Sequence, residues 1–133
     1  MKIKVALFGL GRIGIMHAAD LFSHPKFILK YVFDINQELS LKASRKFKCE
    51  NISDASKAFN DKNIDLIFIA SSTPTHIPLI IRAAKSKKII FCEKPIDLDI
   101  QKVIKCRKEI KKYKPRILIG FNRRYDPGHY SLK

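Results

Sequence analysis

The sequence predicts an α/β protein built on a doubly wound parallel sheet. Short apolar runs alternate along the chain with segments in which apolar residues recur at helical spacing. The runs show no polar alternation, which is typical of strands that are covered by helices on both faces. A glycine-rich turn at residues 9–14 directly follows the first run. Regular strand–helix alternation predicts βαβ units with right-handed crossovers, here about six strands flanked by about five helices.

The first half of the chain is expected to contribute three strands and three helices. Apolar runs predict strands at residues 2–8, 27–33 and 48–51. Helical periodicity predicts helices at residues 12–23, 37–47 and 53–59. In the second of these helices, Leu39, Ala43 and Phe47 stand four residues apart. The third run is weak and the third helix is short, and polar residues 60–63 then interrupt the pattern.

The second half is expected to contribute three further strands and two helices. Apolar runs predict strands at residues 65–70, 88–92 and 116–121. Helical periodicity predicts helices at residues 76–86 and 99–113. The first of these helices places Ile77, Ile80 and Ala84 on one face. We therefore expect residues 1–121 to form one domain and residues 122–133 to begin a crossover out of it.

The charge of the chain is high but dispersed. Its 133 residues include 27 Lys and Arg against 12 Asp and Glu, a formal net charge of +15, which favours binding to nucleic-acid phosphates. The densest basic cluster, at residues 105–114, occupies positions that an apolar helical stripe leaves over. Lys and Ile are enriched together, with 20 of each, which indicates an A+T-rich genome. We therefore expect no specific nucleic-acid binding.

Composition and the cysteines exclude several further classes. The apolar fraction of 46% excludes a disordered chain, and no apolar run approaches the ~20 residues of a membrane span. Cys49, Cys92 and Cys106 have no C-x-x-C spacing, so neither a zinc site nor a disulfide framework is indicated. Scattered cysteines with apolar neighbours are typical of reduced core residues, so we expect a cytoplasmic protein without a metal.

The glycine turn fits the dinucleotide-binding pattern G-x-G-x-x-G in the required context, between a strand and a helix. In this pattern Gly9 allows the tight turn, Gly11 admits a pyrophosphate close to the backbone, and Gly14 allows close helix–strand packing. Arg12 and Ile13 lie between these glycines, and Arg12 is well placed to assist the phosphates. The helix N-terminus would add free N–H groups and partial positive charge.

An acidic residue completes the pattern. Asp34 follows the second run and stands 20 residues after Gly14. A carboxylate there accepts both ribose hydroxyls of an adenosine and repels a 2′-phosphate, and neither Ile35 nor Asn36 replaces it with an arginine. The sequence therefore predicts NAD rather than NADP as cofactor. The alternative is a structural glycine turn with a helix-capping aspartate.

Three more motifs follow strands and carry a family resemblance. Residues 70–76 (ASSTPTH), 91–95 (FCEKP) and 120–127 (GFNRRYDP) come after the fourth, fifth and sixth runs. With the glycine turn, they resemble the N-terminal domain of the glucose–fructose oxidoreductase / inositol 2-dehydrogenase / MocA-like family, nearest the myo-inositol 2-dehydrogenases. The resemblance implies a Rossmann fold, NAD, and hydride transfer between nicotinamide and a cyclic polyol or sugar.

The resemblance also implies roles for the residues after the fifth strand. Lys94 would bond the substrate hydroxyl and assist its deprotonation, and Glu93 would orient the nicotinamide ribose or the lysine. Pro95 would fix the turn, and a cis Lys94–Pro95 bond is consistent with such a proline. The alternative for Lys94 is an ordinary surface lysine in a loop.

The other two motifs supply further candidate cofactor residues. We expect Ser71, Ser72 and Thr73 to lie near the pyrophosphate and the nicotinamide ribose. The alternative is that this loop only lets Thr75 cap the next helix. His76 opens that helix and is a candidate contact, although a histidine at such a place is more often structural than catalytic. Asn122 and Arg123, after the last strand, are also candidate site residues.

The family resemblance implies that part of the enzyme lies outside this chain. In the family, the substrate domain follows the cofactor domain and supplies an Asp–His pair, substrate contacts and the usual oligomer interface. We therefore expect the isolated chain to lack full activity, and a homo-oligomer is possible. The alternative function is a stand-alone or truncated NAD-binding module that acts with a partner chain.

Overall fold

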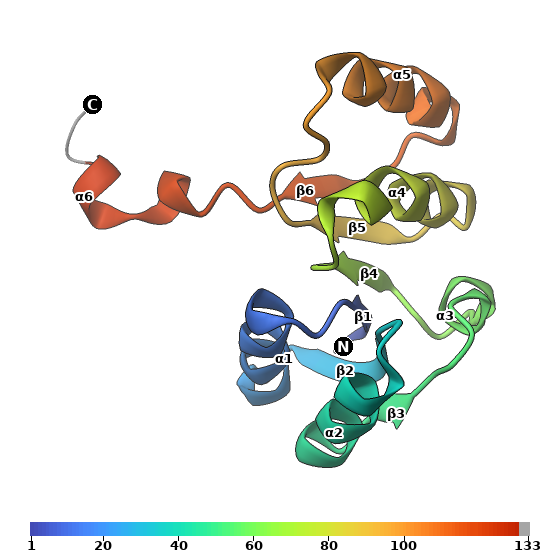
Figure 1. The fold of residues 1–133 in the computed structure, drawn as a ribbon, viewed down its shortest axis with the longest axis vertical. Coiled ribbons are helices and arrows are strands. Elements are labelled where there is room, and N and C mark those ends of the chain that lie inside the picture. Colours follow the sequence, from blue (N-terminus) through green and yellow to red (C-terminus); the bar gives the residue numbers. More distant parts are fainter. Residues whose placement is uncertain (131–133) are drawn as a thin grey trace.

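A computed structural model describes residues 1–130 and contains one six-stranded sheet (Figure 1). The strands are β1 (Ile3–Phe8), β2 (Phe27–Phe33), β3 (Glu50–Asn51), β4 (Leu66–Ile69), β5 (Ile89–Cys92) and β6 (Ile117–Ile119). All neighbouring strands are parallel, in the order β3-β2-β1-β4-β5-β6. The predicted doubly wound Rossmann sheet is thus confirmed. The strand order reverses between β1 and β4, which is where ligands bind in such folds.

Helices cover the sheet on both faces. The α-helices are α1 (Arg12–Ser23), α2 (Gln37–Phe47), α3 (Ser56–Asn60), α4 (His76–Lys85), α5 (Ile100–Ile110) and α6 (Pro127–Tyr130). Short 3₁₀ turns are η1 (Thr73–Thr75), η2 (Lys111–Tyr113) and η3 (Asn122–Tyr125). No helix among residues 1–130 is both long and apolar enough to cross a membrane.

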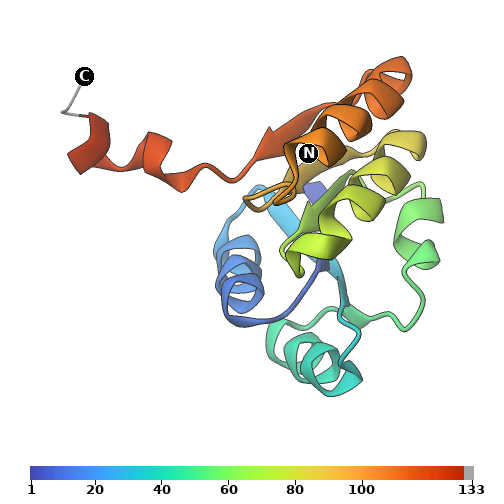
Figure 2. The same cartoon turned by 45° about the horizontal axis from the view of Figure 1, so that its top comes forward.

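The alternation of side chains along the strands divides the core into two layers. Val5 and Leu7 pack with α1 and α2 on one face, whereas Ala6 and Phe8 pack with α3, α4 and α5 on the other. Both faces of β1 are therefore buried, as its unbroken apolar run predicts. Beyond β6, η3 and α6 extend away from the sheet in both views (Figure 1, Figure 2).

Several element boundaries differ from the sequence prediction for local reasons. The expected strand at residues 48–51 shortens to Glu50–Asn51, because Lys48 ends α2 in the left-handed conformation at φ 51°. The expected helix at residues 53–59 begins only at Ser56, because the Asp54 carboxylate accepts the Ser56 N–H at 2.8 Å and forms a turn first. Residues 127–130 form a short helix that the pattern did not predict.

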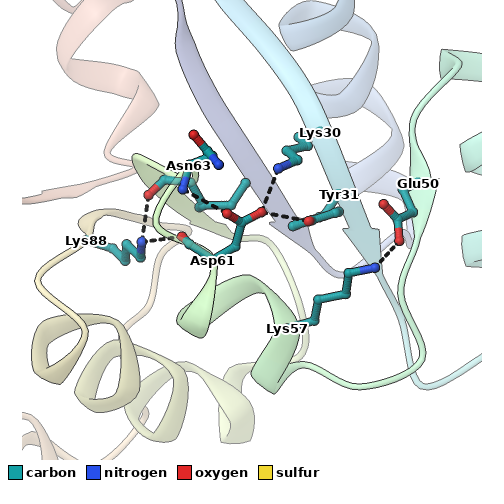
Figure 3. Close-up of polar contacts among 8 residues, drawn as sticks. Lys30, Tyr31, Glu50, Lys57, Asp61, Asn63 and Lys88 are labelled. Carbon is teal, nitrogen blue, oxygen red and sulfur yellow. Dashed lines mark hydrogen bonds and ion pairs between the residues drawn. The ribbon is translucent and has the colours of Figure 1, made fainter.

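A polar cluster lies just before β4 and β5, and we call Lys30, Tyr31, Asp61 and Lys88 the Asp61 cluster (Figure 3). One Asp61 carboxylate oxygen accepts bonds from Lys30 Nζ at 2.6 Å and from the Tyr31 hydroxyl at 2.7 Å. Lys88 Nζ donates to the backbone carbonyls of Asp61 and Ile64 at 2.7 and 2.8 Å. The cluster therefore ties the segment between α3 and β4 to β2 and to the start of β5.

Candidate functional site

A cavity of about 730 Å³ opens at the carboxyl ends of the strands, where the sheet order reverses. It is lined by residues from the ends of β1 and β2, from the turns after β1, β2 and β4, from α1, α2 and α4, and from the residue before α3: Phe8, Gly9, Gly11, Arg12, Ile13, Phe33, Asp34, Ile35, Leu39, Ala55, Ala70, Ser71, Ser72, Pro74, Thr75, Pro78, Leu79 and Arg82. The structure thus brings seven of the fourteen predicted cofactor residues to one place. Gly14 and Thr73 lie beside these lining residues in the chain.

The glycine turn forms the floor of this cavity. Gly9 has φ +93°, and a Cβ there would lie 2.4 Å from the Ser71 nitrogen. A Cβ on Gly14 would lie 1.9 Å from the Gly9 carbonyl oxygen. A Cβ on Gly11, in contrast, would meet no atom within 4 Å. Two of the glycines are therefore required by the fold itself, whereas Gly11 leaves open space beside the backbone.

The N-terminus of α1 points to the same floor. Gly11 is its N-cap residue, no side chain caps the helix, and the first turn contains no acidic residue. The first backbone N–H groups of a helix have no partner within the helix, and they carry partial positive charge. This end of α1 is consequently suited to hold an anion such as a pyrophosphate.

Asp34 lies at the end of β2, on the wall of the cavity. One of its carboxylate oxygens accepts the Leu10 N–H at 2.7 Å, and the other accepts the Asn36 N–H at 2.8 Å. Each oxygen of an ionised carboxylate has two acceptor sites, so each retains one for a ligand hydroxyl. Beyond Asp34 the wall is apolar, with Ile35 90% exposed and Leu39 37% exposed.

The loop after β4 is held by its own hydroxyl groups. The Thr75 hydroxyl donates to the Ser72 carbonyl at 2.6 Å, so the Ser71 hydroxyl donates to Thr75 Oγ1, also at 2.6 Å. Thr75 does not cap α4 with its side chain. Thr75 is thus the N-cap residue of α4 without a capping bond from its side chain, and its hydroxyl instead holds η1 beside the cavity.

The structure does not place His76 at the cavity, and this differs from its prediction as a cofactor contact. The side chain is only 2% exposed. Its Nδ1 lies 2.7 Å from the Pro95 carbonyl oxygen, and its Nε2 lies 2.8 Å from the Ser71 carbonyl oxygen. The η1 turn rotates the start of α4 so that the ring points inward, where it joins the loop after β4 to the loop after β5.

Lys94 lies at a second, smaller cavity of about 360 Å³, together with Phe121, Asn122 and Arg123. The motifs after β5 and β6 therefore meet, as their positions after neighbouring strands predict. Lys94 is exposed, and its peptide bond to Pro95 is cis, which confirms that expectation. The arrangement presents one amine, one amide and one guanidinium to a small polar molecule.

The Glu93 side chain contacts a residue that the sequence analysis did not single out. Glu93 Oε1 lies 2.6 Å from His17 Nε2, and Glu93 Oε2 accepts the Lys94 N–H at 3.3 Å. His17 lies on α1, 76 residues away in the chain. Only its place three residues after Gly14, on the first helix, could have drawn attention to it.

None of the three cysteines lines the dinucleotide cavity or the cavity at Lys94. Burial raises the pKa of the Cys92 thiol to about 12 and that of Cys49 to about 11, and it also raises the pKa of Cys106. All three are free thiols. The thiolate is the nucleophile and the metal ligand, so these residues serve as core side chains.

Comparison with known proteins gives the same fold and cofactor. Residues 3–121 match the family described as an oxidoreductase family with an NAD-binding Rossmann fold. The chain is 39% identical to the inositol 2-dehydrogenase of Rhizobium meliloti over 100% of its own length, and 36% identical to the myo-inositol 2-dehydrogenase of Thermotoga maritima over 98%. It spans only 40% of either relative.

A solved structure supports the likeness in three dimensions. The myo-inositol dehydrogenase of Lactobacillus casei, in complex with NAD(H) and myo-inositol, matches with a TM-score of 0.92 and 29% identity. The match covers 99% of this chain and 40% of that one.

Proposed function

The chain belongs to the oxidoreductase family with an NAD-binding Rossmann fold, and we propose that it is the cofactor-binding part of a dehydrogenase acting on a cyclic polyol of the inositol type. One observation carries this proposal. The open floor at Gly11, the uncapped start of α1 and the carboxylate of Asp34 face one cavity, and Lys94 lies at a second cavity formed by the strand ends of the same sheet.

The residues that line the cavity fit NAD. The N–H groups at the start of α1 would bind the pyrophosphate, and Gly11 would let it approach because no side chain fills the space. Asp34 would accept the ribose hydroxyls with the acceptor sites that its two backbone bonds leave over. Arg12 and the hydroxyls of Ser72 and Thr73 would contact the phosphates and the second ribose.

The chemistry would take place at the loop after β5. Nicotinamide supplies the hydride acceptor when the cofactor is bound. Lys94 would hold the substrate hydroxyl and take part in removing its proton, while Asn122 and Arg123 would orient the other hydroxyl groups. The acid–base pair expected from a second domain would complete the site, with residues 1–121 as the cofactor domain and residues 122–133 as the start of the crossover.

The edge of the sheet at β6 supports a covering partner. Ile117, Leu118 and Phe121 are 39%, 52% and 55% exposed there. Large exposed apolar side chains gathered at one edge mark an interaction surface. A substrate domain or a second copy of the chain would cover them, in a reducing cytoplasmic setting that suits three free cysteines.

Titration with NADH and NADPH tests the cofactor site directly. We expect the chain to bind NADH more tightly than NADPH, as measured by the change in NADH fluorescence. Asp34→Asn removes one acceptor oxygen and should weaken NADH binding by about tenfold to a hundredfold, because a hydrogen bond to a charged group is worth about 1.5–3 kcal/mol. The NADPH affinity should fall less, since a repelling charge is also removed.

Asp97→Asn is the matched control, because Asp97 also accepts a backbone N–H just before a helix but does not line the dinucleotide cavity. NADH binding that Asp34→Asn and Asp97→Asn weaken equally would contradict the assignment. Turnover of myo-inositol is measured on the same chain. We expect little alone, and turnover restored only with an added chain would favour the alternative of a module that needs a partner.

A further inference from the structure

His17 connects two parts of the molecule that the proposed function uses separately. It lies on α1, whose N-terminus faces the dinucleotide cavity, and it contacts Glu93, the first residue after β5. A carboxylate only accepts hydrogen bonds, so the proton in the 2.6 Å contact belongs to His17 Nε2. The contact therefore joins the cofactor helix to the residue that precedes Lys94.

The position of the His17 ring is fixed by two aromatic side chains. Its centroid lies 4.6 Å from that of Phe68 and 5.8 Å from that of Phe91. These two phenylalanines stack on each other at 4.2 Å, on neighbouring strands of the sheet. Because the His17 and Glu93 side chains are only 24% and 20% exposed, water competes weakly for their bond.

The Glu93 carboxylate is also approached by Gly120, the residue that follows β6. A Cβ on Gly120 would lie 3.0–3.1 Å from all three atoms of the carboxylate group. Such contacts are closer than ordinary van der Waals distance, so only glycine at this position leaves the carboxylate where it is. His17 thus provides a hydrogen-bond donor to Glu93, and Gly120 leaves the space that the carboxylate occupies.

The loop that carries Lys94 is held at both ends by histidines. His17 binds the Glu93 carboxylate, whose second oxygen accepts the Lys94 N–H at 3.3 Å. His76, from α4 on the opposite face of the sheet, contacts the Pro95 carbonyl at 2.7 Å. The backbone of Lys94 is therefore fixed between two helices, while its side chain is exposed.

We propose that His17 is a positioning residue: through Glu93 it fixes the backbone at Lys94 and couples the dinucleotide-binding helix α1 to the loop that carries the amine. This inference rests on the proposed function of Lys94 and of the α1 N-terminus. A cofactor that binds at the N-terminus of α1 would act on the Lys94 loop through this bond. No step of the chemistry passes through His17 itself.

Amide hydrogen exchange, measured by NMR on the whole chain, tests the proposal. His17→Leu removes the donor, and His17→Gln keeps an N–H that can reach the carboxylate. We expect exchange at the Lys94 amide to become about tenfold faster in His17→Leu and to return toward the original rate in His17→Gln, because local opening follows the contacts that hold a segment. Amides of β2, which β1 and β4 separate from β5 in the sheet, should keep their order of protection.

His24→Gln is the matched control, since His24 lies next to the C-terminal end of α1 and its ring contacts the nearby residues Lys26 and Phe27. Should His17→Leu fail to fold, Gly120→Ala displaces Glu93 by a different route and should also accelerate exchange at Lys94. An unchanged Lys94 amide in the folded variants, or equal acceleration throughout the chain, would overturn the positioning role.

A second arm adds NADH and separates this inference from the proposed function. NADH should slow exchange at Lys94 in the unaltered chain, and this slowing should be lost in His17→Leu although NADH still binds. Slowing that persists in His17→Leu would refute the coupling. Absence of NADH binding by the unaltered chain would refute the proposed function instead, and the cofactor-free exchange rates would still decide whether His17 holds the loop.

Discussion

The Asp61 cluster and the wall of the dinucleotide cavity each contain a hydrogen-bonded aspartate, but the two aspartates differ in what they have left to bind. In the Asp61 cluster, one carboxylate oxygen accepts two side-chain donors, the other accepts the Asn63 N–H, and the backbone carbonyl accepts Lys88. At the cavity, each Asp34 oxygen accepts one backbone N–H, and α1 begins without a side-chain cap. Protein donors therefore occupy three of the four acceptor sites of the Asp61 carboxylate, but only two of the four on Asp34, which keeps more capacity for a ligand.

This difference teaches how to separate structural from functional charge in a basic chain. Bonds from Lys30, Tyr31 and the Asn63 N–H hold the pKa of Asp61 well below its usual range. That perturbation is large, yet all the causes are protein groups that pin the segment before β4 (Figure 3). A shifted pKa is therefore better evidence for a functional site where the group can still donate or accept a hydrogen bond from a ligand.

Substitutions in the glycine turn should have the largest effects, and they should distinguish residues needed for stability from residues needed for NADH binding. Gly14→Ala places a Cβ 1.9 Å from the Gly9 carbonyl oxygen, a clash with backbone that no rotamer relieves. We expect it to lower the free energy of unfolding by about 3 kcal/mol or more, as overpacking does in its worst cases. Urea denaturation followed by circular dichroism measures this loss.

Gly11→Ala is the matched substitution, because its Cβ meets nothing within 4 Å. The free energy of unfolding should fall by about 1 kcal/mol or less, the usual difference between Gly and Ala at an N-cap. NADH binding should weaken by about tenfold or more, since the Cβ fills the space through which a pyrophosphate approaches. Unaltered NADH affinity in Gly11→Ala would place the pyrophosphate elsewhere.

The next largest effect should come from the Asp61 cluster. In contrast to Gly11→Ala, a substitution there should lower stability and leave NADH binding unchanged. Asp61→Asn loses the bond with Lys30, whose side chain is 32% exposed, and weakens the bond with Tyr31. The free energy of unfolding should fall by about 1–2 kcal/mol, and the affinity for NADH should stay the same. Glu50→Gln is the control, because the Glu50–Lys57 pair is about half exposed and should contribute little.

The effect of pH on this variant has a definite sign. The folded state holds the pKa of Asp61 below its unfolded value, so its stabilising contribution is complete above about pH 4 and is lost as the pH falls further. The difference in unfolding free energy between the unaltered chain and Asp61→Asn should therefore shrink below about pH 4. A difference that stays constant down to pH 2 would show that the carboxylate charge contributes nothing.

Much of the fold and part of the site could be predicted from the sequence because their signals are local. Six apolar runs define the strands, and the spacing of Gly9, Gly11 and Gly14 identifies the turn between a strand and a helix. Asp34 stands at the end of β2, so its place in the sheet follows from its place in the chain. A residue that directly follows a parallel strand has little choice of where to lie.

The remaining features depend on contacts between distant parts of the chain. His17 meets Glu93 because its ring packs against Phe68 of β4 and Phe91 of β5, and the sequence carries no signal for a contact across 76 residues. His76 seemed a cofactor contact from its position at the start of a helix, but the preceding η1 turn directs its ring into the core. Helix rotation is set by packing, which periodicity alone does not resolve.

The smallest expected effect on stability comes from Asn36, which caps a helix and also binds Asp34 at the cavity wall. The Asn36 side chain caps α2 by accepting the Glu38 N–H at 3.1 Å, while its own N–H binds Asp34. Asn36→Ala removes the cap and should lower the free energy of unfolding by about 1 kcal/mol, as measured by urea denaturation. Asp99→Ala removes the equivalent cap of α5 and should cost a similar amount.

Because the Asn36 backbone N–H survives the substitution, Asp34 keeps its orientation, and NADH affinity should stay the same in both variants. A loss of NADH affinity in Asn36→Ala alone would show that α2 as a whole orients Asp34. The two backbone hydrogen bonds to Asp34 would then not be sufficient to hold its carboxylate in place.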